Sequence, residues 1–194
     1  MKAMEEKILA EGKVLPGGIL KVGSFLNQLI DTVFLREVGQ EIARLYEGCG
    51  ATKILTIESS GISIATAAGL EMGVPVLFAK KHKTSNVDGK VYTARVHSYT
   101  HGTDYTIVVS SDYLSPTDRV LLVDDFLANG KALLGLTELV SQAGAQLIGA
   151  AVAIEKGFQG GGDALRARGV RVESLAILDS MSESSITFRS GRPY

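Results

Sequence analysis

An unbroken aliphatic run that ends in two acids is the feature that most constrains the fold of this chain. Residues 120–123 read Val-Leu-Leu-Val, and Asp124 and Asp125 follow directly. A strand that is apolar on both faces is typical of the interior of a parallel sheet. A helical pattern then begins at Lys131 and stops at Gly144. A buried strand followed by a helix predicts an α/β fold with a parallel sheet.

The same alternation of short β-rich runs and helical patterns continues along the chain. It predicts helices over about 1–15, 32–47, 62–73, 131–144 and 161–169, and strands over 53–58, 74–81, 119–125, 146–156 and 170–178. Because crossovers between parallel strands are right-handed and short, we expect helices on both faces of one central sheet. With 194 residues, the chain is long enough for one sizeable core, so a single domain over 1–194 is expected.

Two segments depart from this alternation. The polar stretch 81–90 contains a turn at Asp88-Gly89, and 91–100 and 103–111 then alternate polar and apolar residues. They predict an antiparallel excursion outside the parallel sheet. The segment 179–194 is polar, and we expect no regular element there.

Composition excludes several classes of function. The 20 basic and 21 acidic residues nearly cancel, which argues against a general nucleic-acid binder. Cys49 is the one cysteine, so an internal disulfide is excluded, and the sequence shows no zinc-type spacing of Cys and His. The first residues do not resemble a secretory signal, and no apolar run approaches about 18 residues. We therefore expect a cytoplasmic globular protein without membrane or nucleic-acid partners.

Polar groups gather where two of the predicted strands end. Ligands of parallel sheets lie beyond the carboxyl ends of the strands, so the loop 58–61 and the pair Asp124-Asp125 should face one cleft. Free N–H groups at the start of the helix near Gly130 and Lys131 suit a phosphate. The two carboxylates would repel a phosphate, but they suit sugar hydroxyls, which donate hydrogen bonds. Hydroxyls beside a phosphate describe a ribose 5-phosphate.

These residues resemble a known signature. The stretch LLVDDFLANGKA is similar to the phosphoribosyl-diphosphate motif of type I phosphoribosyltransferases, in which two acids, two apolar residues, Ala-Thr-Gly and Thr or Ser follow an aliphatic run. The chain departs from it at Asn129 and Ala132, so two hydroxyl donors are missing. The variant DDFLANG, the segment PGGILKVGSFLNQLID and the segment IEKGFQGGG all resemble bacterial xanthine phosphoribosyltransferases, and this resemblance spans essentially the whole chain.

The resemblance implies a fold and a reaction. The fold would be the type I phosphoribosyltransferase fold, with a small hood over the base site formed by about 1–36 and part of 155–194. The reaction would transfer ribose 5-phosphate from 5-phospho-α-D-ribose 1-diphosphate to xanthine, giving xanthosine 5′-monophosphate and pyrophosphate in purine salvage. Mg²⁺ would arrive on the diphosphate rather than in a protein-only metal site. The resembling enzymes are homodimers, which implies the same here.

The resemblance also assigns roles to residues. Asp124 and Asp125 would hold the ribose hydroxyls. The 5′-phosphate would lie on Ala128, Asn129, Gly130, Lys131 and Ala132. Pyrophosphate would lie on Ser59, Ser60, Gly61 and Lys81. Xanthine would lie against Leu20, Asn27 and Lys156.

Simpler interpretations stay open for several of these residues. The serines could merely cap the helix that follows them, Lys81 could belong to a solvated turn, and the Lys156 ammonium could extend into water. The histidines His97 and His101 have no Cys or acid partner at metal-ligand spacing, so we place them on the surface or on a lid.

Two other functions also stay open. One is transfer to guanine or adenine instead of xanthine. The other is a purine regulator that senses phosphoribosyl diphosphate and binds DNA. Such regulators carry an additional N-terminal domain, whereas this sequence begins about 15 residues before its first loop, and it shows no basic recognition helix.

Overall fold

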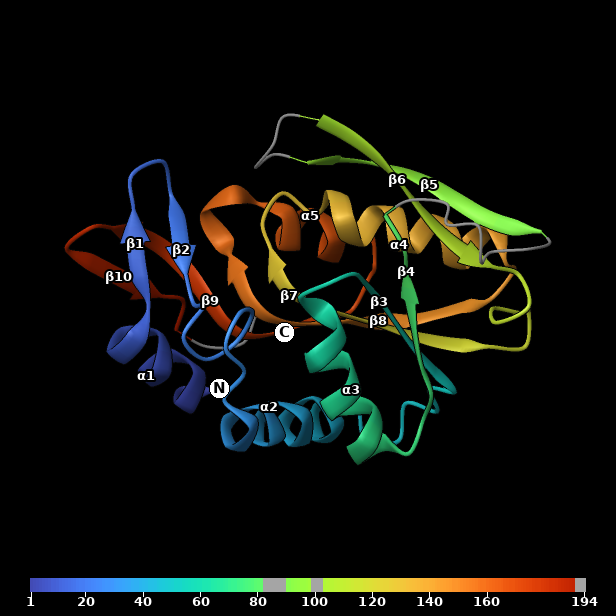
Figure 1. The fold of residues 1–194 in the computed structure, drawn as a ribbon, viewed down its shortest axis with the longest axis horizontal. Coiled ribbons are helices and arrows are strands. Elements are labelled where there is room, and N and C mark those ends of the chain that lie inside the picture. The colour runs from blue at the N-terminus through green and yellow to red at the C-terminus, as the bar shows by residue number, and fades with distance from the viewer. Residues whose placement is uncertain (82–89, 99–102, 191–194) are drawn as a thin grey trace.

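A computed structural model describes residues 1–81, 90–98 and 103–190, and a six-stranded sheet forms its centre (Figure 1). The strand order is β10-β9-β8-β7-β3-β4. The strands are β3 (Lys53–Ile57), β4 (Val76–Ala79), β7 (Arg119–Leu127), β8 (Gln146–Lys156), β9 (Val172–Ser182) and β10 (Ser185–Phe188). The pairs β9–β8, β8–β7, β7–β3 and β3–β4 are parallel, and β10 is antiparallel to β9. The predicted α/β sheet is therefore confirmed, with an antiparallel edge strand added.

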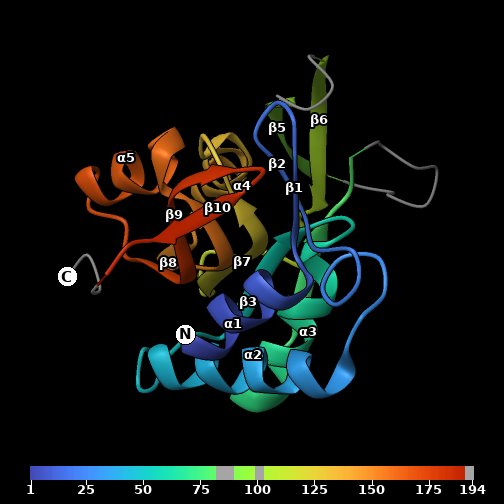
Figure 2. The same ribbon diagram turned by 90° about the vertical axis from the view of Figure 1, so that its left-hand side faces the viewer.

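Helices cover both faces of this sheet, as the sequence predicts. The helices α2 (Thr32–Leu45) and α3 (Gly61–Met72) lie on one face, and α4 (Lys131–Gln142) and α5 (Gly161–Ala167) lie on the other (Figures 1 and 2). The central strand β7 serves both cores. Leu121 and Val123 join the cluster under α2 and α3, whereas Val120 and Leu122 join the cluster under α4. This alternation explains why the run is aliphatic throughout.

The N-terminal segment differs from the single helix expected over about 1–15. The helix α1 (Lys2–Glu11) ends earlier, and β1 (Lys13–Leu15) and β2 (Ile19–Lys21) then form an antiparallel hairpin. Gly12 is already extended, with φ −70° and ψ 146°. Gly17 and Gly18 at the turn have φ of 83° and 72°, which glycine adopts without a steric penalty. The prediction was wrong past Glu11 because these glycines close a hairpin.

A second hairpin lies outside the central sheet, as predicted. The strands β5 (Val91–Ser98) and β6 (Thr103–Ser110) pair antiparallel and pack on α4. The approach is close: a Cβ on Gly135 of α4 would lie 2.5 Å from a methyl of Val96. A bridge between Lys80 and Val108 joins this hairpin to the end of β4. The hairpin therefore lies over the carboxyl-end side of the sheet.

The C-terminal segment contains structure where none was expected. The strand β9 continues to Ser182, and β10 folds back on it and pairs from Ser185 to Phe188. Ile186 and Phe188 are half-buried against the core cluster under α2 and α3. Because the segment is mostly polar, the sequence did not indicate that Ile186 and Phe188 would pack on the core. Residues 191–194 lie outside the described range. In the described part of the chain, no helix is long and apolar enough to cross a membrane.

Candidate functional site

The two predicted loops meet at one edge of the sheet. The strands β3 and β7 are parallel neighbours, so their carboxyl ends lie side by side. The helix α3 starts at Gly61 directly after β3. A Cβ on Gly61 would lie 3.0 Å from Asp124 Oδ1 and 2.2 Å from Thr56 Oγ1. Glycine is therefore required here, because a larger residue would push the loop away from the acid.

The acid pair lies within the last part of β7, which continues to Leu127. Asp124 is 5% exposed, and its Oδ1 accepts a hydrogen bond from the Asp125 N–H at 2.9 Å. Asp125 Oδ1 accepts one from the Phe126 N–H at 3.0 Å. Burial raises the pKa of the Asp124 carboxyl well above its usual range, the Asp125 carboxylate raises it further, and the Lys81 ammonium acts in the opposite direction. A second hydrogen-bonding partner or a cation would favour ionised Asp124.

The loop between β7 and α4 borders a small cavity. Gly130 caps α4 with φ +81°, and the Lys131 N–H donates to Asn129 Oδ1 at 3.1 Å. The other N–H groups of the first helical turn remain the natural donors of such a loop. A cavity of about 170 Å³ lies over it. Its lining consists of residues 126–133 together with His97 and Tyr105 from the β5–β6 hairpin.

The loop between β3 and α3 carries the two serines. Ser60 stands at the N-cap of α3, but its side chain makes no capping hydrogen bond. The Ser59 carbonyl accepts from the Ile62 N–H at 3.2 Å, and the Ser60 carbonyl accepts from Ser63 Oγ at 3.3 Å. The peptide bond between Glu58 and Ser59 is cis. The serine at the cap position is therefore not engaged in the simpler capping role.

Lys81 lies beside this loop, at the end of β4. Its N–H donates to Glu58 Oε1 at 2.5 Å, which joins the ends of two neighbouring strands. Its ammonium lies 5.4 Å from the centre of the Tyr105 ring. Burial and the Asp124 carboxylate raise the pKa of the Tyr105 hydroxyl. The residues 82–89 that follow Lys81 lie outside the described residues.

The N-terminal segment meets the site at two points. Asn27 Nδ2 donates to Asp125 Oδ2 at 3.2 Å. The Lys156 ammonium, at the end of β8, donates to the Gly18 carbonyl at 2.9 Å and lies 5.7 Å from the Phe126 ring centre. Burial lowers the pKa of Lys156. The ammonium therefore meets a carbonyl rather than extending into water. Leu20, on β2, is buried.

Sequence reasoning missed two residues of the site. Tyr105 shares one face of β6 with Ile107 and Val109, and this alternation was a usable signal. His97 is exposed, as predicted, but the sequence did not indicate that it also lines the cavity over residues 126–133. Its Nδ1 lies 2.6 Å from Asp104 Oδ1 across the hairpin, a pairing that the sequence spacing alone did not indicate. His101 lies outside the described residues.

Comparison with known families agrees with this geometry. The profile of the phosphoribosyl transferase domain matches residues 30–176. The chain belongs to this family. A protein of Oceanobacillus iheyensis named xanthine phosphoribosyltransferase is 50% identical over 189 residues, covering 97% of each chain. A protein of the same name from Bacillus cytotoxicus is 51% identical over 188 residues, covering 97% of this chain and 95% of the other.

Solved structures show the same fold. An adenine phosphoribosyltransferase of Giardia lamblia, complexed with 9-deazaadenine, superposes with a TM-score of 0.74 at 25% identity, covering 90% of this chain and 96% of the other. The adenine phosphoribosyltransferase of Trypanosoma brucei gives a TM-score of 0.76 at 18% identity, covering 98% and 86%. The expected type I phosphoribosyltransferase fold is confirmed, since these enzymes share the sheet and its helices.

Proposed function

We propose that this chain transfers ribose 5-phosphate from 5-phospho-α-D-ribose 1-diphosphate to xanthine, giving xanthosine 5′-monophosphate and pyrophosphate in purine salvage. The observation that carries the proposal is the close approach of the start of α3 to the acid pair of β7, because a Cβ on Gly61 would lie 3.0 Å from Asp124 Oδ1. In this proposal, one anion-binding loop lies on either side of the carboxylate pair. The names of relatives about 50% identical over 97% of the chain support xanthine as the base.

The reaction breaks the bond between C1 of the ribose and the diphosphate oxygen, and it forms a bond from C1 to a purine nitrogen. The base loses one N–H proton, which passes to the leaving pyrophosphate or to water. Positive charge develops on the sugar ring, and negative charge develops on the leaving pyrophosphate. Asp124 and Asp125 would accept hydrogen bonds from the ribose hydroxyls and stabilise the positive ring. Ser59, Ser60, Gly61 and Lys81 would hold the leaving pyrophosphate.

The 5′-phosphate would lie over the start of α4. The loop has no hydroxyl side chain, so its donors would be the backbone N–H groups of 128–132 other than that of Lys131, the Lys131 ammonium and the Asn129 amide. The cavity of about 170 Å³ over these residues is where a phosphate group would be held. Holding the phosphate fixes the ring against the incoming base, which favours reaction by orientation.

Mg²⁺ would accompany the diphosphate. In the described part of the chain, no group of three His, Cys, Asp or Glu side chains is arranged to hold a metal ion. The oxygen donors at the site, Asp124 and Asp125, fit a hydrated ion whose other ligands come from the substrate. When bound, Mg²⁺ would neutralise charge on the leaving pyrophosphate.

The base would be held between the N-terminal segment and the end of β8. Xanthine presents two carbonyl oxygens, so its pocket needs donors. The Lys156 ammonium and the Asn27 amide are donors. The Asn27 amide already meets Asp125, and the Lys156 ammonium meets the Gly18 carbonyl of the N-terminal segment. Leu20 on β2 would pack against the ring. In this assignment the first 36 residues and part of 155–194 form the hood of one domain.

A panel of bases tests the proposal. Purified protein, Mg²⁺ and phosphoribosyl diphosphate are incubated separately with xanthine, guanine, hypoxanthine and adenine, and nucleotide formation is followed. We expect preferential formation of xanthosine 5′-monophosphate. Turnover only with another base would agree with the proposed phosphate sites but would show that xanthine is not the substrate. Tight phosphoribosyl-diphosphate binding without turnover, together with DNA binding at physiological salt, would indicate the regulator instead.

We also propose that the enzyme is a cytoplasmic homodimer. Leu29, Val33 and Leu70 are exposed large apolar side chains on or next to α2 and α3. An apolar groove of about 350 Å³ lies between the same two helices. Apolar patches of this kind are common at subunit interfaces. Sedimentation of the purified protein tests the dimer, and replacing Leu70 and Val33 together by Ser should shift it toward the monomer.

A further inference from the structure

The glycine-rich segment GFQGGG, residues 157–162, lies against the loop proposed for the 5′-phosphate. The Gly161 N–H donates to the Ala128 carbonyl at 3.1 Å. A Cβ on Gly161 would lie 2.3 Å from the Ala128 carbonyl oxygen and 2.5 Å from the Gly130 nitrogen. Gly130 in turn lies against Gly161, because its own Cβ would approach the Gly161 carbonyl oxygen to 3.4 Å. The two backbones therefore touch without intervening side chains.

A buried carboxylate lies behind this segment. Glu155, on β8, is fully buried, and a Cβ on Gly162 would lie 2.0 Å from its Oε1. Gly162 therefore contacts the Glu155 carboxylate, and the preceding Gly161 contacts the loop 128–132. Gly162 and Gly161 leave no space for a side chain on either face. A movement of the Glu155 carboxylate would therefore be transmitted to Ala128 and Gly130.

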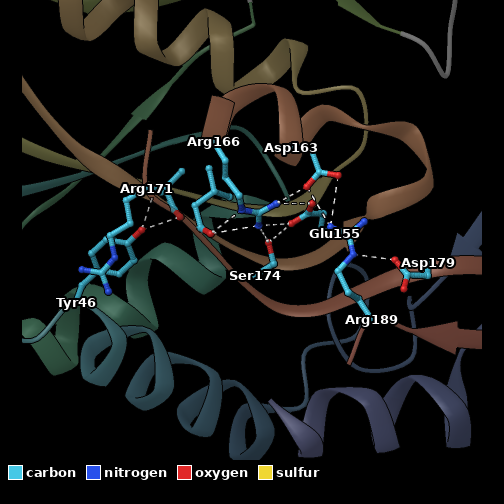
Figure 3. A network of polar contacts seen from close by, with 10 residues as sticks. Tyr46, Glu155, Asp163, Arg166, Arg171, Ser174, Asp179 and Arg189 are labelled. Carbon is cyan, nitrogen blue, oxygen red and sulfur yellow. Dashed lines mark hydrogen bonds and ion pairs between the residues drawn. The ribbon is translucent and has the colours of Figure 1, made fainter. Parts of the chain in front are cut away.

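Arg166 fixes the carboxylate in place. Its Nη1 and Nη2 donate to Glu155 Oε1 and Oε2 at 2.9 and 2.7 Å, a two-bond pairing that fixes orientation as well as distance (Figure 3). The same guanidinium donates to the Val172 carbonyl through Nε at 3.3 Å and Nη2 at 3.2 Å. Ser174 Oγ donates to Glu155 Oε2. One side chain thereby connects α5, β8 and β9.

We propose that the turn at Gly160–Gly162, held by the buried pair of Glu155 and Arg166, is the support that sets the position of the 5′-phosphate loop. Arg166 is then a positioning residue for the 5′-phosphate, which it does not touch. This inference rests on the proposed function, because it needs the loop 128–132 to bind that phosphate. It also gives a role to a motif that the proposed reaction leaves unused.

A purely structural role makes a different prediction. If the turn and the ion pair only stabilise the fold in general, disrupting them should weaken binding of every ligand in proportion to the loss of stability. A support for one loop would weaken 5′-phosphate binding and leave the pyrophosphate loop after β3 unaffected. Ribose 5-phosphate and pyrophosphate, each with Mg²⁺, report on the two loops separately. Their dissociation constants can be measured by calorimetry on the same full-length protein.

The first variant changes space alone. Gly161→Ala should displace the loop backbone, because its Cβ would overlap Ala128 and Gly130. We expect the affinity for ribose 5-phosphate to fall at least about tenfold, because the loop's N–H donors would no longer point at the phosphate; a misplacement of about 1 Å can cost roughly a hundredfold in rate. The affinity for pyrophosphate should change less than about twofold.

The control variant is also overpacked, though less closely, and it lies away from the loop 128–132. Gly69→Ala in α3 would place a Cβ 2.7 Å from a Val76 methyl and 2.9 Å from the Val74 carbonyl, at the start of β4. It should lower the thermal midpoint and leave both affinities unchanged. If Gly161→Ala and Gly69→Ala reduce both affinities in parallel, the support is no more than general packing and the inference is wrong.

A second variant tests the ion pair. It keeps the proposal testable even if the single replacements prevent folding. Replacing both residues, Glu155→Met with Arg166→Met, removes two charges together and leaves none unpaired. We expect a folded protein whose ribose 5-phosphate affinity falls while its pyrophosphate affinity holds. Unchanged affinity for both ligands would overturn the role of the pair. Wild-type protein that binds pyrophosphate but not ribose 5-phosphate would overturn the phosphate placement itself.

Discussion

Asp124 and Asp125 are neighbours in the chain but lie in different surroundings. Asp124 is buried and is bonded to the following backbone N–H, whereas Asp125 is half-buried and meets Asn27 from the N-terminal segment. The pair itself was readable from the sequence, because two acids at a strand end are unusual. The contact with Asn27 was not, since it joins residues 98 positions apart, and only the folded chain brings them together.

The acid pair should be required for turnover. Asp124→Asn combined with Asp125→Asn removes both negative charges near the developing positive ring. We expect kcat to fall at least about a hundredfold, the size of loss that follows removal of a single electrostatic contact to a transition state. Circular dichroism should show an intact fold. A double variant with near-normal activity would show that the ribose lies elsewhere.

Lys156 should act on the base rather than on phosphoribosyl diphosphate. Lys156→Met keeps most of the buried stem and removes the ammonium, which separates charge from packing. A hydrogen bond to a charged group contributes about 1.5–3 kcal/mol, so the KM for xanthine should rise roughly ten- to hundredfold. The KM for phosphoribosyl diphosphate should stay within about twofold. Equal increases in both constants would exclude Lys156 from the base pocket.

At the scale of elements, strength of local pattern decided what could be predicted. The strands β3, β7 and β8 and the helices α2 and α4 carry long periodic or aliphatic runs, and they lie close to where the sequence places them. The strands β1, β2 and β10 have three or four residues each. Strands this short depend on their pairing partner rather than on their own propensity. The sequence therefore did not indicate the β1–β2 hairpin or the pairing of β10 with β9.

The turn of the β1–β2 hairpin should influence base binding. Gly17→Ala forces an L-residue into φ +83°, at a cost of about 1–2 kcal/mol, although no atom lies within 4 Å of the new Cβ. The neighbouring Gly18 carbonyl, which meets Lys156, should move. We expect the KM for xanthine to rise severalfold and the KM for phosphoribosyl diphosphate to stay constant.

A matched glycine separates strain from position. Gly48 also has a positive φ, of 69°, and open space around it. It precedes β3, so it lies at the amino ends of the strands, away from the proposed site. Gly48→Ala should lower the thermal midpoint to a similar degree without changing either KM. If the two variants change the KM for xanthine alike, the hairpin turn has no special role in the base site.

At the scale of the whole molecule, the buried Asp124 carboxyl lowers the free energy of unfolding near neutral pH. Burial raises the pKa of Asp124 in the folded chain above its unfolded value of about 3.9. Below that value both states are protonated, and the group makes no difference. As the pH rises through the interval up to the folded pKa, the unfolded state loses its proton first, and folding becomes less favourable.

Removing this charge should therefore stabilise the protein while it damages activity. We expect Asp124→Asn to have a higher thermal midpoint than the wild type at pH 7, and the difference should shrink as the pH falls toward 4. Thermal scans of both proteins without ligand, from pH 4 to 8, measure it. A difference that stays constant over this range would show that the gain comes from something other than the buried charge.

The N-terminal position of the hairpin and of Asn27 has a consequence for how such enzymes diversify. The shared domain profile begins at residue 30, and Leu20 and Asn27 precede it. Two of the three residues proposed to hold the base thus lie before the matched domain, whereas the residues proposed to hold the sugar and phosphates lie within it. If the proposed base site is right, exchanging the residues before 30 between relatives, with Lys156 kept, should change the preferred base while the phosphate sites stay as they are.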